Sequence, residues 1–276
     1  MIPIRHETSS YTNRDLQLFF RTWTPREQSP KYTVLLLHGW GDHSGRYMHV
    51  GQALARAGAM VIAPDLAGHG RSPGPRGLIR KWQHLVEDME ALLTHAGVSE
   101  PCAVFGHSMG GLLALTLADA YPNRIKSLVL SSPLVVSDQA VILQKLAGIL
   151  GTLLPSLPTI SLDLRELSSD LRVAAKAESD PLYFHGKMPA STGKVFVSAM
   201  QAIRPENGVF DLPILGFHGS ADKLTSPEGS QFIFASARHP ASEFSLLPGL
   251  RHETLNEDGA MTRLQSVVAW LEAQMS

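Results

Sequence analysis

Residues 101–121 place a strand, a tight turn and a helix in immediate succession. Residues 101–105 form a short apolar run typical of a buried strand, and residues 109–121 have the pattern of a helix that ends at Pro122. The turn between them reads Gly-His-Ser-Met-Gly, with Ser108 at its centre. The flanking glycines indicate that strand and helix lie too close there for side chains. The pattern predicts a serine hydroxyl exposed above the edge of a sheet.

Apolar runs of strand length alternate with helix-like segments along much of the chain. Residues 15–23 alternate like an edge strand, whereas the continuous apolar run 33–37 is typical of a central strand. Strands that alternate with helices at this spacing indicate a mostly parallel, doubly wound α/β sheet. The other predicted strands are 59–63, 127–130, 212–217 and 242–247, and the other predicted helices are 49–57, 82–96 and 257–275.

The alternation stops after Pro133. Residues 134–204 contain helix-like patterns and several prolines but no clear strand. This interruption predicts a helical cap inserted into the sheet domain. We therefore expect a core formed by residues 1–133 and 209–276, with residues 134–208 as the cap.

Composition excludes several classes of protein. With 276 residues, 44% hydrophobic and 18% charged, the chain has ordinary globular values and can bury a substantial core. A net charge of −1 without a basic block argues against nucleic acid as a partner. The single cysteine, Cys102, excludes an internal disulfide, and no histidine–cysteine cluster suggests a metal, so we expect no cofactor. The chain has neither a signal-peptide pattern nor an uninterrupted transmembrane run, and the expectation is a cytoplasmic protein.

A serine hydroxyl needs a neighbouring imidazole to accept its proton, and the imidazole needs a carboxylate to orient it. In open α/β sheets such groups collect on loops at the carboxyl ends of strands. His252 lies in the loop after the predicted strand 242–247, which makes it the expected general base for Ser108. Three other histidines fit this position less well: His185 in the cap, His218 near a strand end and His239 before a proline.

The carboxylate is expected after the preceding strand. Asp222 follows residues 212–217 and therefore reaches the same sheet edge as His252. A simple turn or helix-capping role is the alternative for Asp222. The competing acids are less suitable: Asp211 precedes the strand, Asp180 lies in the cap and Asp119 lies within the helix after Ser108.

Acyl transfer also needs hydrogen-bond donors for the developing oxyanion. The backbone N–H of Met109, directly after Ser108, is one candidate. The loop His-Gly-Trp-Gly after residues 33–37 offers the second through the N–H of Trp40. In residues 65–72 a tight turn is favoured, with Asp65 and His69 bonded to the backbone rather than acting in catalysis.

Five motifs span most of the chain outside the cap. They read HGWGDHSGRY (38–47), DLAGHGRS (65–72), GHSMGG (106–111), HGSADKLTSPEGS (218–230) and HETLNE (252–257). With them the chain resembles the monoacylglycerol lipase and lysophospholipase-like branch of the α/β-hydrolase superfamily. The resemblance implies an α/β-hydrolase fold and the triad order Ser108, Asp222, His252. Asp42 departs from the branch, which more often carries glutamate there; we expect no change in chemistry.

The cap is where the resemblance is weakest. Residues 141–154 are more apolar than a solvent-exposed lid requires. They could pack on the sheet domain, line a tunnel for an acyl chain, or touch a membrane surface, and the last two readings can coexist. A deep apolar pocket with a few polar groups near Ser108 suits a monoacylglycerol.

These observations predict a serine carboxylester hydrolase that cleaves monoacylglycerols, or related single-chain lipid esters, through an acyl-enzyme. Lysophospholipase and short-chain esterase activity are the nearest alternatives. A serine aminopeptidase is less favoured because it needs cap carboxylates near the site, for which Glu178 and Asp180 are the candidates. A non-catalytic binding protein on the same fold is the alternative from a different class. The expected partner is a lipid ester, with membrane-surface contact through the cap as one reading.

Overall fold

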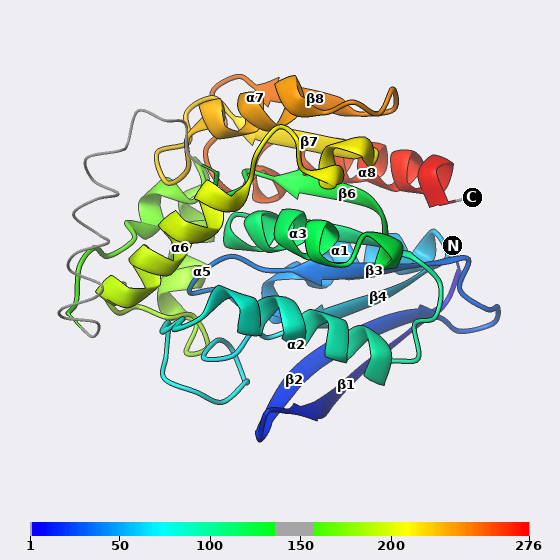
Figure 1. Cartoon of the computed structure of the whole chain (residues 1–276), viewed down its shortest axis with the longest axis horizontal. Helices are drawn as coiled ribbons and strands as arrows, with labels where there is room; N and C mark the ends of the chain where they lie inside the picture. Colours follow the sequence, from blue (N-terminus) through cyan, green and yellow to red (C-terminus); the bar gives the residue numbers. More distant parts are fainter. Residues whose placement is uncertain (1, 136–156, 276) are drawn as a thin grey trace.

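Eight strands form one sheet in the computed structural model, which describes residues 2–135 and 157–275 (Figure 1). The strand order is β1-β2-β4-β3-β5-β6-β7-β8. β1 is antiparallel to β2, β2 is antiparallel to β4, and all other neighbours are parallel. The strands are β1 (Ile4–Asn13), β2 (Leu16–Pro25), β3 (Tyr32–Leu37), β4 (Ala59–Pro64), β5 (Cys102–His107), β6 (Ile125–Ser131), β7 (Ile214–Gly219) and β8 (Glu243–Leu247).

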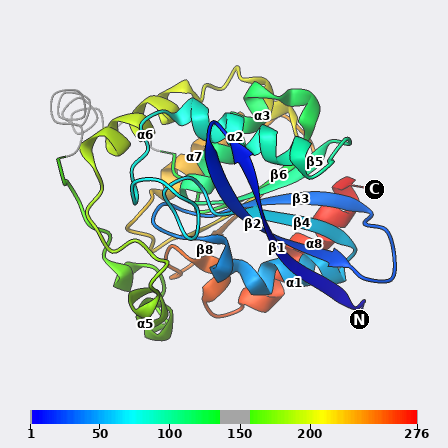
Figure 2. The ribbon, with the colours of Figure 1, turned by 90° about the horizontal axis from the view of Figure 1, so that it is seen from below.

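Helices cover both faces of the sheet (Figure 2). On one face, α1 (Met48–Arg56) and α8 (Ala260–Met275) pack over an apolar cluster that includes Leu54 and Leu271. On the other face, α2 (Trp82–His95), α3 (Met109–Ala120) and α7 (Pro227–Ser236) pack over a second cluster. The predicted doubly wound, mostly parallel architecture is confirmed.

The amino-terminal hairpin corrects the expected edge strand. β1 occupies the edge and β2 lies inside the sheet, with Leu18, Phe20 and Trp23 buried. The expectation that residues 15–23 form the edge was therefore wrong. Most residues of β1 are polar and exposed, so it lacks the alternation that marks a half-buried strand.

The other predicted elements are present within three residues of their expected ends. Short apolar runs between glycines and prolines gave reliable strands because parallel strands are buried on both faces. Apart from β1 and α7, the strands and helices of the sheet domain were therefore predicted from the periodicity of apolar residues.

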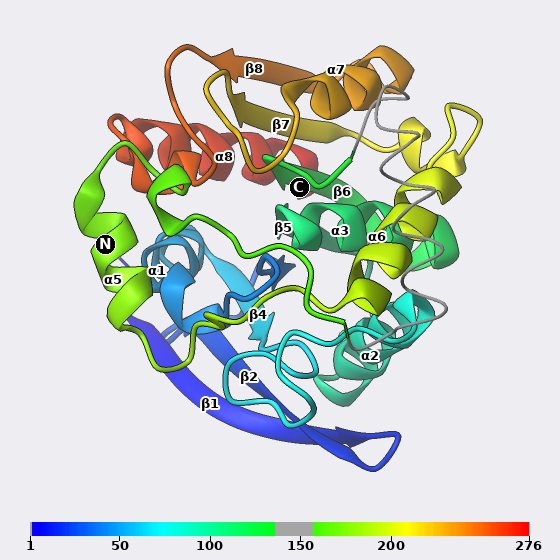
Figure 3. The same cartoon turned by 90° about the vertical axis from the view of Figure 1, so that its left-hand side faces the viewer.

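The segment between β6 and β7 is described at residues 132–135 and 157–213, and its longer regular elements there are helical. It contains α5 (Leu171–Ser179), α6 (Ala190–Ala202) and two 3₁₀ turns, η4 (Leu164–Glu166) and η5 (Gly208–Asp211). Figure 3 shows α5 and α6 on opposite sides, with extended chain between them in front of the strand ends. The apolar run 141–154 lies outside the described residues. Among the described helices, none is long and apolar enough to cross a membrane.

Candidate active site

Ser108 stands on a strained turn between β5 and α3. Its φ is 55° and its ψ is −119°, in a region that residues with a Cβ rarely adopt. The turn is held from both sides: the Ser108 N–H donates to the carbonyl of Ser131 at 3.0 Å, and its carbonyl accepts from the N–H groups of Gly111 and Leu134, each at 2.9 Å. Backbone bonds to a neighbouring strand end thus fix the direction of the serine side chain.

The two glycines of the turn are required by close packing. A Cβ on Gly106 would lie 2.2 Å from the carbonyl oxygen of Gly110, and one on Gly110 would lie 2.2 Å from that of Leu37. No side chain fits at either position. The sequence interpretation, that strand and helix approach too closely for side chains, is confirmed.

His252 and Asp222 meet at the carboxyl edge of the sheet. The Nδ1 atom of His252 lies 2.7 Å from Oδ2 of Asp222, and both side chains are buried. Asp222 follows β7 and His252 follows β8, as their positions in the sequence predict. Because an ionised carboxylate only accepts, Nδ1 carries a hydrogen, and in the neutral imidazole the lone pair is then on Nε2.

Oδ2 of Asp222 has two further side-chain partners that the sequence analysis missed. Oδ2 of Asp222 lies 3.0 Å from Nε2 of His218 and 2.9 Å from the hydroxyl of Thr225. Nδ1 of His218 lies 2.7 Å from the hydroxyl of Ser230. Burial raises the pKa of Asp222, but hydrogen bonds from His218 and His252 outweigh it and leave the pKa well below its usual range. No local sequence pattern signals this contact, because it depends on how the loop after β7 turns back toward His218.

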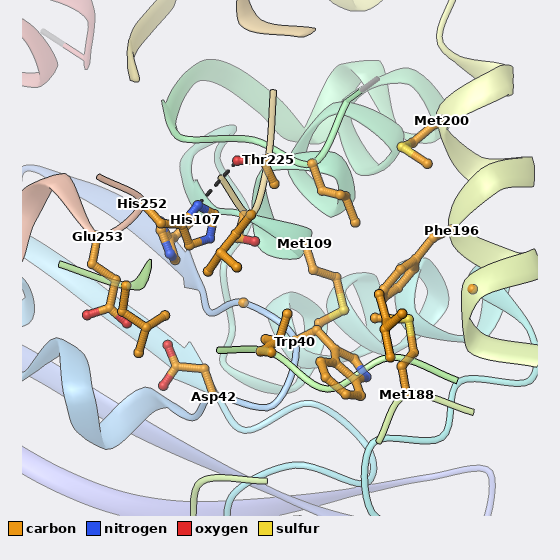
Figure 4. Close-up of a pocket in the computed structure, with 18 of the residues that line it drawn as sticks. Trp40, Asp42, His107, Met109, Met188, Phe196, Met200, Thr225, His252 and Glu253 are labelled. Atoms are coloured by element: carbon orange, nitrogen blue, oxygen red, sulfur yellow. Dashed lines mark hydrogen bonds between the residues drawn. The ribbon is translucent and has the colours of Figure 1, made fainter. Parts of the chain in front are cut away.

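A cavity of about 300 Å³ joins Ser108 to His252. Figure 4 shows its two unlike sides: Asp42, His252 and Glu253 lie on one, whereas Met188, Phe196 and Met200 lie on the other. The rest of the wall is largely apolar and includes Leu134, Ile160, Leu162, Leu167, Val197 and Leu224. The serine therefore opens to a space that is polar near the imidazole and apolar beyond it.

Both expected oxyanion donors belong to residues of the cavity wall. Met109 is the first residue of α3, so its N–H has no acceptor within the helix. The loop after β3 lies against the serine, because a Cβ on Gly39 would be 3.2 Å from Cβ of Ser108. The Trp40 side chain is fixed separately: its Nε1 donates to the carbonyl of Gly77 at 2.9 Å.

Arg46 joins two buried acids on the polar side. Its guanidinium makes two hydrogen bonds to Glu253, at 2.7 and 2.9 Å, and lies 3.3 Å from Oδ1 of Asp42. The Tyr47 hydroxyl donates to Oδ2 of Asp42 at 2.9 Å. Burial raises the pKa of Asp42, but the charges of Arg46, His38 and His43 together with the His43 N–H outweigh that effect, so the net pKa is lowered. Asp42 is consequently ionised, and the positive charge of Arg46 beside it balances its negative charge.

His107 lines the cavity without a charge. Its ring centroid is 4.7 Å from that of His252, and its Nδ1 lies 3.1 Å from the hydroxyl of Ser131. Burial lowers the pKa of His107 to about 3. The ring is therefore neutral at physiological pH and presents no repelling charge to His252.

The turn at residues 65–72 has the structural role that the sequence favoured. Oδ1 of Asp65 accepts from the N–H of Ser44 and Oδ2 from that of Arg71, both at 2.8 Å. Nδ1 of His69 lies 3.0 Å from the carbonyl of Ala67.

Within residues 2–135 and 157–275, the cavity wall includes none of the rival groups His185, His218, His239, Asp119, Asp180 and Asp211. Over the same ranges, no three His, Cys, Asp or Glu side chains form a group that could hold a metal ion.

Comparison with known proteins identifies the family. The family model described as serine aminopeptidase, S33, matches residues 28–259. A monoacylglycerol lipase of Mycolicibacterium smegmatis is 33% identical over 265 residues, which cover 94% of each chain. A monoglyceride lipase of Rattus norvegicus is 29% identical over 270 residues, covering 94% of this chain and 88% of the relative.

A solved structure has the same architecture over nearly the whole chain. The crystal structure of Paleococcus ferrophilus monoacylglycerol lipase superposes with a TM-score of 0.83 at 29% identity, covering 93% of this chain and 99% of that one. The α/β-hydrolase fold expected from the motifs is thus confirmed. The chain belongs to the serine aminopeptidase S33 family of α/β-hydrolases and is similar to the monoacylglycerol lipases among its relatives.

Proposed function

We propose that this protein is a carboxylic ester hydrolase that cleaves monoacylglycerols into a fatty acid and glycerol. The observation that carries the proposal is the cavity beside Ser108, with a polar side at His252 and an apolar remainder. A monoacylglycerol has the same division: one long apolar chain and a small head with two hydroxyl groups. The similarity to monoacylglycerol lipases over 94% of the chain supports the same substrate class.

The mechanism begins with attack of the Ser108 hydroxyl on the ester carbonyl, while Nε2 of His252 accepts the hydroxyl proton. The N–H groups of Trp40 and Met109 stabilise the negative oxygen of the tetrahedral intermediate. His252 then gives its proton to the glycerol oxygen, which leaves an acyl-enzyme on Ser108. Water, deprotonated by His252, attacks this ester and releases the fatty acid.

Asp222 keeps His252 in the required tautomer and stabilises its charged form. The 2.7 Å distance between Nδ1 of His252 and Oδ2 of Asp222 supports this role. The low pKa of Asp222 supports it as well, because the carboxylate stays ionised wherever the imidazole is active.

We propose that residues 134–208 act as the cap and hold the acyl chain. Most of the apolar wall comes from this segment, notably Met188, Phe196 and Met200. The glycerol head is then placed on the side of Asp42 and Glu253, where carboxylate oxygens can accept from hydroxyl groups. The core of the enzyme is formed by residues 1–133 and 209–276.

We also propose transient contact between the cap and a lipid surface. Ile160 lines the cavity and is 62% exposed, and Leu157 close by is 39% exposed. Flotation with phosphatidylcholine vesicles tests this contact: Ile160→Glu is expected to lose binding. Leu171→Glu, which changes an equally exposed leucine on α5 outside the cavity wall, is the matched control. Equal binding of both variants and the wild type would contradict the contact.

The two cap acids that the sequence offered for binding the amine of a peptide do not serve that role in the described structure. Oδ2 of Asp180 lies 2.9 Å from Nε2 of His43, and among the described residues neither Asp180 nor Glu178 lines the cavity. The absence of both cap acids from the described wall supports an ester substrate over an aminoacyl amide, because the sequence offered these acids as the amine-binding groups of a peptidase.

Labelling with a fluorophosphonate probe tests the nucleophile. The wild-type protein is expected to be labelled, and Ser108→Ala is expected to lose labelling and about 10⁶-fold in kcat on monoacylglycerol. Ser198→Ala, at an exposed serine of α6, is the control and should retain both. Wild-type activity in Ser108→Ala would overturn the mechanism.

A further inference from the structure

Gly193 occupies the interior of α6, where glycine is a poor choice. It is the fourth residue of a thirteen-residue helix, and its backbone does not need the positive φ that favours glycine. Glycine is among the weakest helix formers because the unfolded chain loses most freedom there. Its presence in α6 therefore calls for a reason outside the helix itself.

Close packing supplies that reason for the other glycines inside described α-helices. In each case an added Cβ would meet another group at less than 3 Å: Gly51 of α1 against Trp23, Gly110 and Gly111 of α3 against Leu37 and Pro133, and Gly229 of α7 against Val135. At Gly193, the nearest described atom to an added Cβ is Sδ of Met188, at 3.9 Å, an ordinary contact distance. The described neighbours thus leave room for a side chain.

The space that Gly193 faces is the cavity. Gly193, Phe196, Val197 and Met200 all line it, and their spacing of three, four and seven residues places them on one face of α6. Thr192 belongs to a different face, where its hydroxyl accepts from the N–H of Ile79 at 2.9 Å. In Figure 4, Phe196 and Met200 stand on the far side of the cavity from His252. Gly193 is the one residue of this cavity-lining face without a side chain.

We propose that Gly193 determines the length of acyl chain that the enzyme accepts, by leaving open a part of the apolar cavity that any larger residue would fill. This inference rests on the proposed function for its substrate, a fatty acyl ester. A side chain at residue 193 competes with the distal methylene groups of a long chain and leaves the reacting carbonyl at Ser108 untouched. Each methylene group of the substrate that can no longer enter the apolar cavity lowers kcat/KM for that substrate by about fourfold.

The test is a chain-length series of monoacylglycerols and p-nitrophenyl esters, from four to eighteen carbons, with Gly193→Ala and Gly193→Leu. For long chains we expect kcat/KM to fall about fourfold in the alanine variant and by a larger factor in the leucine variant. For the shortest esters it should stay at the wild-type value. The melting temperature of Gly193→Ala should rise by about 1–3 °C, because alanine is the better helix former. Ser198→Ala and Ser198→Leu, on the exposed side of α6, are the matched controls.

Two results would overturn the proposal. One is an unchanged chain-length profile, or an equal loss at all lengths, in variants that fold. The other is a lower melting temperature for Gly193→Ala, which would show that packing requires the glycine. If Gly193→Leu does not fold, the chain-length profile of Gly193→Ala still tests the proposal. A wild-type protein that cleaves p-nitrophenyl esters but no monoacylglycerol would refute the proposed function, while the p-nitrophenyl series would still test Gly193.

Discussion

Oδ2 of Asp222 lies between two imidazoles, 2.7 Å from Nδ1 of His252 and 3.0 Å from Nε2 of His218. The carboxylate that orients the proposed base is therefore itself held by a second, fully buried histidine. Ser230 extends the chain, because its hydroxyl lies 2.7 Å from Nδ1 of His218. The orientation of His252 depends on this whole row of hydrogen bonds.

His218 is expected to act as a positioning residue. His218→Leu removes a donor to an ionised, buried carboxylate, and kcat should fall about tenfold or more with little change in KM. His218→Gln places an amide donor near the position of Nε2 and should recover most of the loss. Steady-state kinetics on monoacylglycerol measure both. Equal activity of the leucine and glutamine variants would show that the hydrogen bond does not matter.

Asp222→Asn is expected to preserve the fold and remove most activity. The asparagine amide can donate to Nδ1 of His252, which places the hydrogen on Nε2 and blocks proton transfer from Ser108. By analogy with the same change in other serine hydrolases, kcat should fall about 10⁴-fold. A circular dichroism melt confirms folding, and a loss of less than tenfold would argue against the assigned role.

Two buried histidines, His69 and His107, should make the fold sensitive to acid. Burial lowers the pKa of His69 and of His107 to about 3, whereas the unfolded chain titrates near 6.5. Between these values the unfolded state binds more protons than the folded state, so stability falls as the pH decreases. Each histidine contributes up to about 1.4 kcal/mol per pH unit.

Urea denaturation at pH 7.5, 5.5 and 4.5 measures this dependence. His69→Gln removes one titrating group, so the slope of unfolding free energy against pH should become shallower by about 1.4 kcal/mol per unit below pH 6. An unchanged slope in this variant would mean that His69 does not stay neutral in the folded protein.

Arg46 is expected to be essential for stability. Arg46→Leu leaves Asp42 and Glu253 as buried carboxylates without their cation, at a cost of about 3–5 kcal/mol. The combined variant Asp42→Asn, Arg46→Leu, Glu253→Gln removes the uncompensated charges and should recover a large part of that loss. The denaturant midpoints of the single and the combined variant are compared. Equal midpoints would contradict the explanation that uncompensated buried charge causes the loss of stability.

The sheet domain could be predicted from the sequence, and the triad could be proposed from it, because both rest on local patterns. Buried parallel strands are continuous apolar runs, and the loops that follow them reach the same edge of the sheet. Because Ser108, Asp222 and His252 each follow such a strand, the sequence placed them at that edge. β1 was missed because its side chains are mostly polar and exposed. His218 was set aside as a poor candidate for the base; its contact with Asp222 depends on the loop after β7 turning back, which no local pattern reports. The cavity wall was beyond prediction for the same reason, since it is assembled from distant segments.

A direct comparison of substrates tests the central claim. Purified protein is assayed for kcat/KM on a monoacylglycerol, a lysophosphatidylcholine of the same acyl chain and an aminoacyl amide, with Ser108→Ala as the blank. The account predicts release of fatty acid from the monoacylglycerol with the highest kcat/KM of the three and no measurable cleavage of the amide. Cleavage of the amide without release of fatty acid from the monoacylglycerol would contradict it.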